Sequence, residues 1–335
     1  MEYAPLLRKV IARDDLTESE AAATIGEIMD GAFTPVQSAG LLAALASKGE
    51  TLSEVIGAAT AMRERSLRVE HGLPTVVDVV GTGGDGANTI NISTMAALTV
   101  AAAGVPVAKH GNRAASSACG SADVLEAGGM AIDVPPEKAA KMLREAGFAF
   151  MFAPRYHPAM KYVGPVRREL GVRTVFNVLG PLTNPARATH QVVGVAREEH
   201  IELVGNVLSA FGVTGAVVHA SSGMDEVGGE GPTTVYEFEG ERRERWTLDP
   251  QDYKIHAPLE ALRGGSTDAC RAAFESILNG EQSPRADVVA LNAALVFTAC
   301  KRTQDLREGL ELARMQLQEG RAAAVFERAK RFSHG

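Results

Sequence analysis

The first 70 residues carry apolar side chains at spacings of three and four positions, which is the pattern of amphipathic helices. Helix-capping residues mark three helix starts, at Thr17, Thr34 and Thr51, and Gly49 follows the expected end of the second helix. Runs of alternating β-branched residues are missing in this segment. The pattern therefore predicts a small helical domain over residues 1–72.

The pattern changes at Pro74, after which short apolar runs alternate with helical periodicity. The predicted strands are 75–80, 105–108, 148–152, 190–196, 215–220 and 233–238. Helices are predicted between them, for example over 94–103, 136–146 and 198–211, and the last 70 residues return to helix. This alternation indicates a larger α/β domain, 73–335, with a mostly parallel central sheet covered by helices. A sheet of this kind binds ligands beyond the carboxyl ends of its strands.

The composition fits such a fold, because the chain of 335 residues has 34 glycines and only 5% aromatic residues. A formal net charge of −7 disfavours a non-specific nucleic-acid binder, which needs a broad basic surface. The net charge does not disfavour anionic substrates, because a binding site needs only local positive charge and oriented backbone amides.

The three cysteines, Cys119, Cys270 and Cys300, lie far apart in the chain and form no CxxC motif. We therefore expect neither a disulfide framework nor a zinc site, and a reducing compartment. The N-terminus lacks a signal-peptide pattern, and the longest apolar run, 95–108, is shorter than the roughly 20 residues of a membrane span. The sequence predicts a cytoplasmic protein with no membrane partner.

The first predicted strand leads into a glycine-rich segment, GTGGDGANTINIST, at residues 81–94. Its glycines let the backbone approach a ligand closely and turn N–H groups toward an anion. Asn91, Ser93 and Thr94 stand at the expected start of a helix, where side-chain donors and the helix dipole favour negative charge. No lysine follows as in a P-loop, and the GxGxxG spacing of a dinucleotide fold is not met cleanly. The alternative is a tight strand-to-helix turn with caps, but the polar run after the glycines favours an anion-binding loop.

A second polar segment, KHGNRAASSACGSAD at residues 109–123, follows the predicted strand 105–108. Lys109 can act as a point charge on a phosphate, and Asn112 offers both a donor and an acceptor to a substrate amine or ring substituent. The alternative is a solvated basic loop with serine caps. Because the two segments lie about one helix apart, they can flank a single crevice.

Together the two segments resemble the phosphoribosyl-pyrophosphate segments of the anthranilate phosphoribosyltransferase family, and the resemblance runs from about residue 1 to 330. It implies that part of 160–185 completes the helical domain, and that the protein is a homodimer formed through the N-terminal helices. It also implies a set of residues that bind phosphoribosyl pyrophosphate. These are Gly81, Gly84, Asp85, Thr89, Asn91, Ile92, Ser93, Thr94, Lys109, His110, Gly111, Asn112, Arg113, Ser116, Ser117 and Ser121.

The segment 150–185 resembles the same family and carries four cations that we expect on one helix. They are Lys161, Arg167, Arg168 and Arg173. Arginine is suited to bidentate contact with an aromatic carboxylate. The resemblance assigns Gly81, Asn112 and Arg167 to anthranilate. The alternative is that the arginines cover a helix face or a subunit contact, which we favour for Arg168.

Asp225 and Glu226 follow the predicted strand 215–220. Adjacent carboxylates after a strand can bind Mg²⁺, which prefers oxygen ligands and keeps several waters. By itself such a pair is weak evidence for a metal. The resemblance implies that Ser93, Asp225 and Glu226 hold Mg²⁺ on the pyrophosphate.

The resemblance implies transfer of the 5-phosphoribosyl group from phosphoribosyl pyrophosphate to the amine of anthranilate, in tryptophan biosynthesis. The aromatic amine is neutral at pH 7, so we assign no catalytic acid or base. Two alternatives stay open: a pyrimidine nucleoside phosphorylase of the same architecture, and a non-enzymatic nucleic-acid-binding paralogue. The segments GTGGDG and KHGNR differ from the glycine and lysine-serine motifs of a pyrimidine nucleoside phosphorylase. The net charge of −7 disfavours a nucleic-acid-binding protein.

Overall fold

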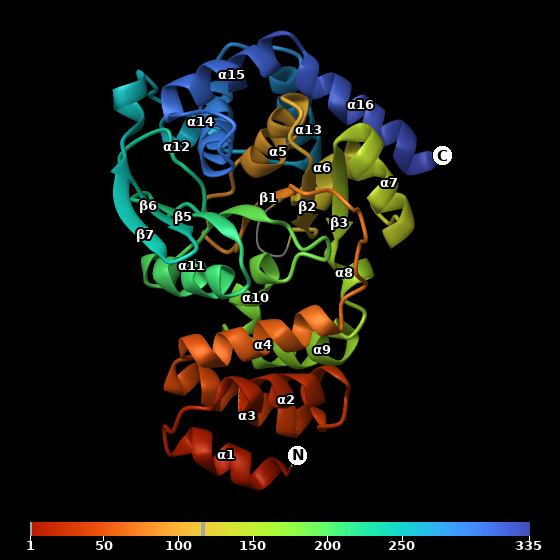
Figure 1. The fold of residues 1–335 in the computed structure, drawn as a ribbon, viewed down its shortest axis with the longest axis vertical. Coiled ribbons are helices and arrows are strands. Elements are labelled where there is room, and N and C mark those ends of the chain that lie inside the picture. The colour runs from red at the N-terminus through yellow and green to blue at the C-terminus, as the bar shows by residue number, and fades with distance from the viewer. Residues whose placement is uncertain (1, 115–117) are drawn as a thin grey trace. The chain divides into compact units, whose positions relative to one another are not determined.

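The computed structural model describes residues 2–114 and 118–335, which form two compact units (Figure 1). One unit contains Met1–Arg68 and Pro154–Pro185, and the other contains Val69–Ala153 and Ala186–Gly335. The division of the sequence into a domain of residues 1–72, with part of 160–185, and a domain of residues 73–335 stays a prediction.

The first unit is built from helices, and the short helix α8 (Ala153–Tyr156) lies at its boundary. Its other helices are α1 (Tyr3–Ile11), α2 (Glu18–Met29), α3 (Pro35–Lys48), α4 (Leu52–Glu64), α9 (Met160–Leu170) and α10 (Phe176–Leu182). Thr17, Thr34 and Thr51 each cap a helix start, as the sequence predicts, and in all three cases a capping box is complete. The apolar faces pack α2 against α4 and α1 against α3.

The second unit contains a seven-stranded sheet in the order β3-β2-β1-β4-β5-β6-β7. Its strands are β1 (Val77–Gly81), β2 (Val107–Gly111), β3 (Phe148–Phe152), β4 (His190–Gly194), β5 (Thr214–Ala220), β6 (Thr233–Glu239) and β7 (Arg242–Leu248). The first five strands are parallel, and β6 and β7 add an antiparallel hairpin at one edge. This is the predicted α/β fold with a mostly parallel sheet.

Helices cover both faces of the sheet: α5 and α14 pack on one side, and α11 lies on the other side (Figure 1). The helices of this unit are α5 (Ile92–Ala102), α6 (Ser121–Ala127), α7 (Pro136–Ala146), α11 (Ile201–Ala210), α12 (Leu259–Leu262), α13 (Thr267–Leu278), α14 (Pro284–Ala299), α15 (Leu306–Gln318) and α16 (Arg321–His334). Two 3₁₀ helices span Glu198–His200 and Pro250–Tyr253. The helix α5 is buried along nearly its whole length, which places its first turn firmly against the sheet.

Two details of the sheet differ from the sequence prediction. The strand predicted at 105–108 lies at Val107–Gly111, because Lys109 and His110 pair with Phe150 and Met151 of β3. Lys109 and His110 are therefore buried strand residues, and the alternative of a solvated basic loop is wrong for them. The strand β7 was not predicted, because its charged residues face solvent at the edge of the sheet.

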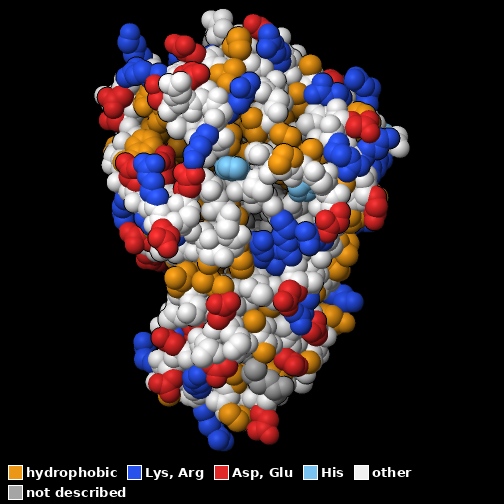
Figure 2. All heavy atoms as spheres, viewed as in Figure 1, with side chains coloured by type: hydrophobic (Ala, Val, Ile, Leu, Met, Phe, Trp, Pro, Cys, Tyr) orange, Lys and Arg blue, Asp and Glu red, His pale blue; other side chains and the backbone are white. Residues whose placement is uncertain are grey.

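Acidic and basic side chains are interspersed over most of the face shown in Figure 2. Within the described residues, no helix is both long enough and apolar enough to cross a lipid bilayer.

Candidate functional site

The strand order creates a topological switch point between β1 and β4. The chain adds β2 and β3 on one side of β1 and then continues with β4 on the other side. Because β1 to β5 are parallel, their carboxyl ends lie along one edge of the sheet. Ligands of open α/β sheets bind in the crevice outside these ends, at such a switch point. The glycine segment, the basic segment and the acidic pair all follow these strand ends.

The glycine segment turns sharply after β1. Gly83, Gly84 and Gly86 have φ angles of 69°, 76° and 75°, in the left-handed region that favours glycine. The Gly83 amide donates a hydrogen bond of 2.6 Å to Oδ2 of Asp225. A Cβ atom at Gly81 would lie 2.3 Å from the same oxygen, so glycine is needed where the acidic pair approaches the strand end.

The acidic pair lies against the start of α5. The Ser93 amide donates to Oε1 of Glu226 at 2.9 Å, and the Thr89 hydroxyl donates to Oε2 at 3.4 Å. The Asp225 amide donates to Oδ2 of Asp85 at 3.4 Å. The fold thus brings together two segments that the sequence analysis assigned to one site. The Glu226 carboxylate accepts from an amide in the first turn of α5, and a helix N-terminus is a place where anions bind well.

Lys109 lies beneath this group, and its side chain is fully buried. Its Nζ atom donates to the Val79 carbonyl at 2.6 Å and to the Ser93 hydroxyl at 3.3 Å. Burial lowers the pKa of Lys109, and the carboxylates of Asp78, Glu226 and Asp225 oppose that shift. The amino group of Lys109 therefore lies among acidic side chains at the strand ends.

The pKa values of both carboxyl groups of the pair are raised. Burial, followed by the charge of Asp85, raises the pKa of Asp225 to about 7, although the Gly83 amide opposes the shift. Burial, followed by the charge of Asp225, raises the pKa of Glu226 to about 8, although the Ser93 amide opposes it. Both groups are short of positive charge, which is the environment that a divalent cation would complete.

The residues present fit a hard cation such as Mg²⁺. Over residues 2–114 and 118–335, no group of three or more His, Cys, Asp or Glu side chains is arranged to hold a metal ion. A cation held by Asp225 and Glu226 would therefore take its other ligands from Ser93, water or substrate oxygens. Mg²⁺ binds in this way in proteins, through one or two carboxylates together with substrate phosphates.

The segment after β2 packs close to the glycine segment. The Asn91 side chain donates to the Cys119 carbonyl at 3.1 Å, which joins the two segments. Asn112 is exposed, and the Ser121 hydroxyl donates to its carbonyl at 3.2 Å. The Arg113 guanidinium forms ion pairs with acidic residues of α6, so it is held within the chain. Two predicted donor-binding residues, Ser116 and Ser117, lie outside the described residues.

Three further predicted donor-binding residues have buried side chains. They are Ile92, Thr94 and His110. Ile92 and Thr94 belong to the first turn of α5, and His110 belongs to β2. Gly84 is exposed, and Gly111 is partly exposed at the end of its strand.

Arg167 belongs to the helical unit, near the C-terminal end of α9. It is partly buried, its guanidinium lies 5.8 Å from the centre of the Phe176 ring, and burial lowers its pKa. Arg168 is exposed. Of the four cations expected on one helix, Arg173 lies outside it, because Gly171 ends α9 with a φ of 63°.

Asp78 is a site-supporting residue to which the sequence analysis gave no role. It is fully buried in β1, and its Oδ1 atom accepts from the His110 amide at 3.1 Å. The Gln191 side chain of β4 donates to its Oδ2 atom at 3.4 Å. An Asp between apolar neighbours in a predicted buried strand was the available signal, since a buried Asp needs partners.

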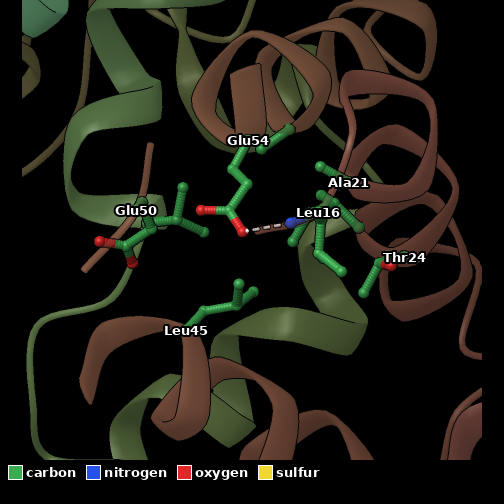
Figure 3. A pocket seen from close by; sticks show the side chains of 9 residues that line it. Leu16, Ala21, Thr24, Leu45, Glu50 and Glu54 are labelled. Atoms are coloured by element: carbon green, nitrogen blue, oxygen red, sulfur yellow. Dashed lines mark hydrogen bonds between the residues drawn. The ribbon is translucent and has the colours of Figure 1, made fainter. Parts of the chain in front are cut away.

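A cavity in the helical unit is too small for a substrate. It has a volume of about 10 Å³ and is lined by residues such as Leu16, Leu45, Glu50 and Glu54 (Figure 3). That volume is about the space of one water molecule. The strand ends of the α/β unit remain the candidate site.

Family models match both parts of the chain. A model described as "Glycosyl transferase family, helical bundle domain" matches residues 4–66, and one described as "Glycosyl transferase family, a/b domain" matches residues 73–323. The fold and the strand-end site thus define a glycosyl transferase of this class.

Individual relatives narrow the class. An anthranilate phosphoribosyltransferase from Symbiobacterium thermophilum is 49% identical over 98% of this chain and 97% of its own length. The crystal structure of anthranilate phosphoribosyltransferase from Thermus thermophilus is 44% identical, with a TM-score of 0.94 over 98% of this chain and 99% of that one. A Saccharomyces cerevisiae structure of the enzyme, solved in complex with PRPP and Mg, is 26% identical, with a TM-score of 0.91 over 99% and 98% of the two chains. The chain belongs to the anthranilate phosphoribosyltransferase family.

Proposed function

We propose that the protein transfers the 5-phosphoribosyl group of phosphoribosyl pyrophosphate to the amine of anthranilate, which releases pyrophosphate. The reaction belongs to tryptophan biosynthesis. The observation that carries the proposal is the cluster of Lys109, Ser93 and Glu226 at the strand ends. It is supported by relatives named anthranilate phosphoribosyltransferase that match this chain over nearly their full length. The yeast relatives solved with PRPP and Mg and with 4-fluoroanthranilate support both substrates.

The donor is proposed to bind at the strand ends of the α/β unit. The glycine segment offers backbone amides, and Lys109 offers a buried positive charge. We assign Ser93, Asp225 and Glu226 to Mg²⁺; when bound, the ion neutralises charge on the departing pyrophosphate. The other residues of this site hold and orient the donor. The protein therefore acts mainly by positioning the substrates and by electrostatic stabilisation, and it forms no covalent bond to them.

Anthranilate is proposed to contact Gly81, Asn112 and Arg167. Arg167 suits the carboxylate, because guanidinium binds carboxylates in bidentate fashion. Arg167 is partly buried, so its guanidinium has already lost part of its hydration. It therefore gains more electrostatic energy from a carboxylate than a fully hydrated guanidinium would. The exposed Asn112 carries a donor and an acceptor that can orient the amine.

No acid or base is required of the protein for the attack, because the aromatic amine reacts in its neutral form. A nucleoside phosphorylase is disfavoured, because the relatives that span the whole chain are anthranilate phosphoribosyltransferases.

The activity is tested by the loss of anthranilate fluorescence. We expect the loss to require both phosphoribosyl pyrophosphate and Mg²⁺, and to stop with a chelator. Fluorescence that stays constant with both present, while donor hydrolysis or phosphorolysis of a nucleoside proceeds, would overturn the proposal.

We also propose a homodimer formed through the N-terminal helices. The most exposed large apolar side chains of this unit include Ile11, at 66%, and Val36, at 82%. Burial against a second copy would remove them from water. A cytoplasmic location is supported by three cysteines that form no disulfide.

A further inference from the structure

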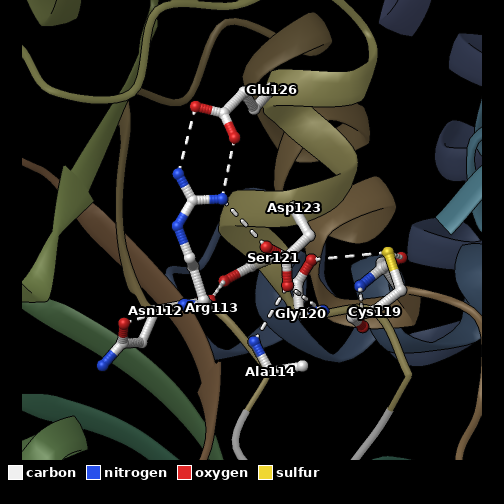
Figure 4. A network of polar contacts seen from close by, with 9 residues as sticks. Asn112, Arg113, Ala114, Cys119, Gly120, Ser121, Asp123 and Glu126 are labelled. Carbon is white, nitrogen blue, oxygen red and sulfur yellow. Dashed lines mark hydrogen bonds and ion pairs between the residues drawn. The ribbon is translucent and has the colours of Figure 1, made fainter.

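One carboxylate joins two parts of the segment that follows β2. Asp123 lies in the first turn of α6, and its Oδ2 atom accepts hydrogen bonds from the amides of Ala114 and Gly120, both at 2.9 Å (Figure 4). Its Oδ1 atom accepts from Nη1 of Arg113 at 3.0 Å. Three donors from both sides of the segment therefore converge on a single side chain.

Other contacts bring the same backbone close to α6. The Ala122 amide and the Ser121 hydroxyl both donate to the Asn112 carbonyl at 3.2 Å. A Cβ atom at Gly120 would lie 2.4 Å from the Ala114 nitrogen, so only glycine lets the backbones at Gly120 and Ala114 approach this closely. The backbone conformation that Asp123 stabilises therefore also requires glycine at position 120.

The hydrogen bonds that Asp123 accepts are expected to be stronger than the neighbouring ion pair between Arg113 and Glu126. The Asp123 side chain is 19% exposed, and although burial alone would raise its pKa, the bonds from Ala114, Gly120 and Arg113 lower it. Arg113 and Glu126 are about half exposed, and an ion pair in such a position contributes little to stability. Charge-assisted bonds to backbone amides in a partly buried place are the stronger ones.

We infer that Asp123 is a positioning residue for the phosphoribosyl-donor site, acting through the backbone of Asn112, Arg113 and Ala114. The inference rests on the proposed function and goes beyond it, because Asp123 belongs to none of the assigned binding sets. The Arg113 guanidinium donates to Asp123 and to the more exposed Glu126, and only its bond to Asp123 belongs to the proposed role. The hydrogen bond from the Asn91 side chain to the Cys119 carbonyl connects this segment to the start of α5, where the glycine segment ends.

The test compares Asp123→Asn with the matched control Glu126→Gln. Both changes remove one negative charge that faces Arg113, but only the first alters the group that accepts from the two amides. The Asn side chain offers these amides a neutral oxygen in place of a carboxylate oxygen, and its NH₂ group cannot accept from Arg113. For Asp123→Asn we expect the donor KM to rise about tenfold or more, the factor for a lost charge-assisted hydrogen bond. The anthranilate KM should rise by a smaller factor, because Asn112 is the only one of the three proposed anthranilate contacts that lies in this segment. Glu126→Gln should leave both KM values within about twofold, because an exposed ion pair contributes little.

Gly120→Ala provides a second, independent variant. It keeps the charge of Asp123 but pushes the Ala114 backbone away, so it should raise the donor KM in the same direction. Should Asp123→Asn not fold, this variant decides the question. The inference is overturned if the donor KM is unchanged in a folded variant, or if it rises by no more than the anthranilate KM, as a general structural defect would cause.

The two proposals fail in distinguishable ways. Wild-type protein without anthranilate-dependent turnover would refute the proposed function. Wild-type turnover with an unaltered donor KM in both variants would refute the role of Asp123 alone. Calorimetric titration with pyrophosphate and Mg²⁺ gives a readout independent of turnover, and we expect weaker binding to Asp123→Asn than to Glu126→Gln.

Discussion

The Glu226 carboxylate accepts a hydrogen bond of 2.9 Å from the Ser93 amide, in the first turn of α5. The two residues are 133 positions apart in the chain. A carboxylate thus lies on a helix N-terminus of the kind that binds phosphate, beside the buried Lys109. We therefore expect substrate binding to involve this acidic residue, either through a cation or by displacing it.

The combined change Asp225→Asn and Glu226→Gln tests the acidic pair. We expect kcat to fall by roughly two to three orders of magnitude, the size seen when an electrostatic stabiliser is removed, and the remaining rate to be insensitive to Mg²⁺. Steady-state rates against Mg²⁺ concentration provide the measurement. Glu230→Gln, an exposed acid of the same loop, is the control and should behave as wild type. An unchanged Mg²⁺ dependence in the double variant would mean that the pair is purely structural.

Arg167→Ala tests the proposed anthranilate site. A charged hydrogen bond is lost, so we expect the anthranilate KM to rise about ten- to a hundredfold, while the donor KM changes far less. Arg168→Ala is the matched control, because Arg168 is adjacent but exposed. Fluorescence titration that found intact anthranilate affinity in Arg167→Ala would refute the assignment.

The raised pKa values of the acidic pair predict a pH dependence of stability. Because folding raises the pKa of Asp225 to about 7 and of Glu226 to about 8, folding favours their protonated forms. Their contribution to stability is fully present below their ordinary pKa values and is lost as the pH rises through about 7 and 8. With a chelator present, Tm measured by calorimetry should carry a component that falls over this range.

The same scan has two internal checks. Mg²⁺ should reduce the fall, because a bound cation favours the ionised carboxylates. The variant with Asp225→Asn and Glu226→Gln should show a flatter profile. Identical profiles for wild type and variant would show that other groups govern the pH dependence.

Glu50 predicts a stabilising substitution in the helical unit. Its Oε1 atom is buried without a hydrogen-bond partner among the described residues, and burial raises its pKa. The neighbouring Glu54 is satisfied, since it accepts from the Leu16 amide and from Lys48, both at 2.9 Å. Replacing a poorly solvated charge with an amide should stabilise the protein, so Glu50→Gln should raise the free energy of unfolding at pH 7 by about 1 kcal/mol.

The sign of this effect depends on pH. A carboxyl group with a raised folded-state pKa contributes stability at low pH that is lost as the pH rises, so the gain from Glu50→Gln should shrink toward pH 4. Urea unfolding at both pH values measures it. Asp15→Asn, whose carboxylate is 63% exposed, should change stability by less than about 0.5 kcal/mol. A destabilised Glu50→Gln protein would contradict the prediction.

Val36→Asp tests the proposed homodimer. Val36 is 82% exposed on α3, and its burial in a subunit contact would be worth about 1.5 kcal/mol or more. The change should therefore raise the dimer dissociation constant at least about tenfold, as measured by light scattering after size exclusion. Lys9→Gln on α1 gives a polar control. A wild-type protein that is monomeric at every concentration would refute the dimer.

Local chemistry made much of the fold predictable from the sequence. Helix caps depend only on residues close together in the sequence, so Thr17, Thr34 and Thr51 located three helix starts correctly. The helix 136–146 and the strand 148–152 were predicted with the bounds that the structure has. The alternation of strands and helices sufficed to predict a mostly parallel sheet, because parallel strands need such crossovers.

The tertiary structure decided what depends on distant partners. Lys109 looks like a loop residue in the sequence, but pairing with β3 buries it, and an exposed edge position lets the charged residues of β7 form a strand. Asp123 gave no signal because its meaning lies in which amides reach it, and Asp225 meets Gly83 across 142 positions. Sequence patterns report local periodicity and side-chain chemistry, whereas burial and convergence at the strand ends arise only when the chain folds and the dielectric around each group is set.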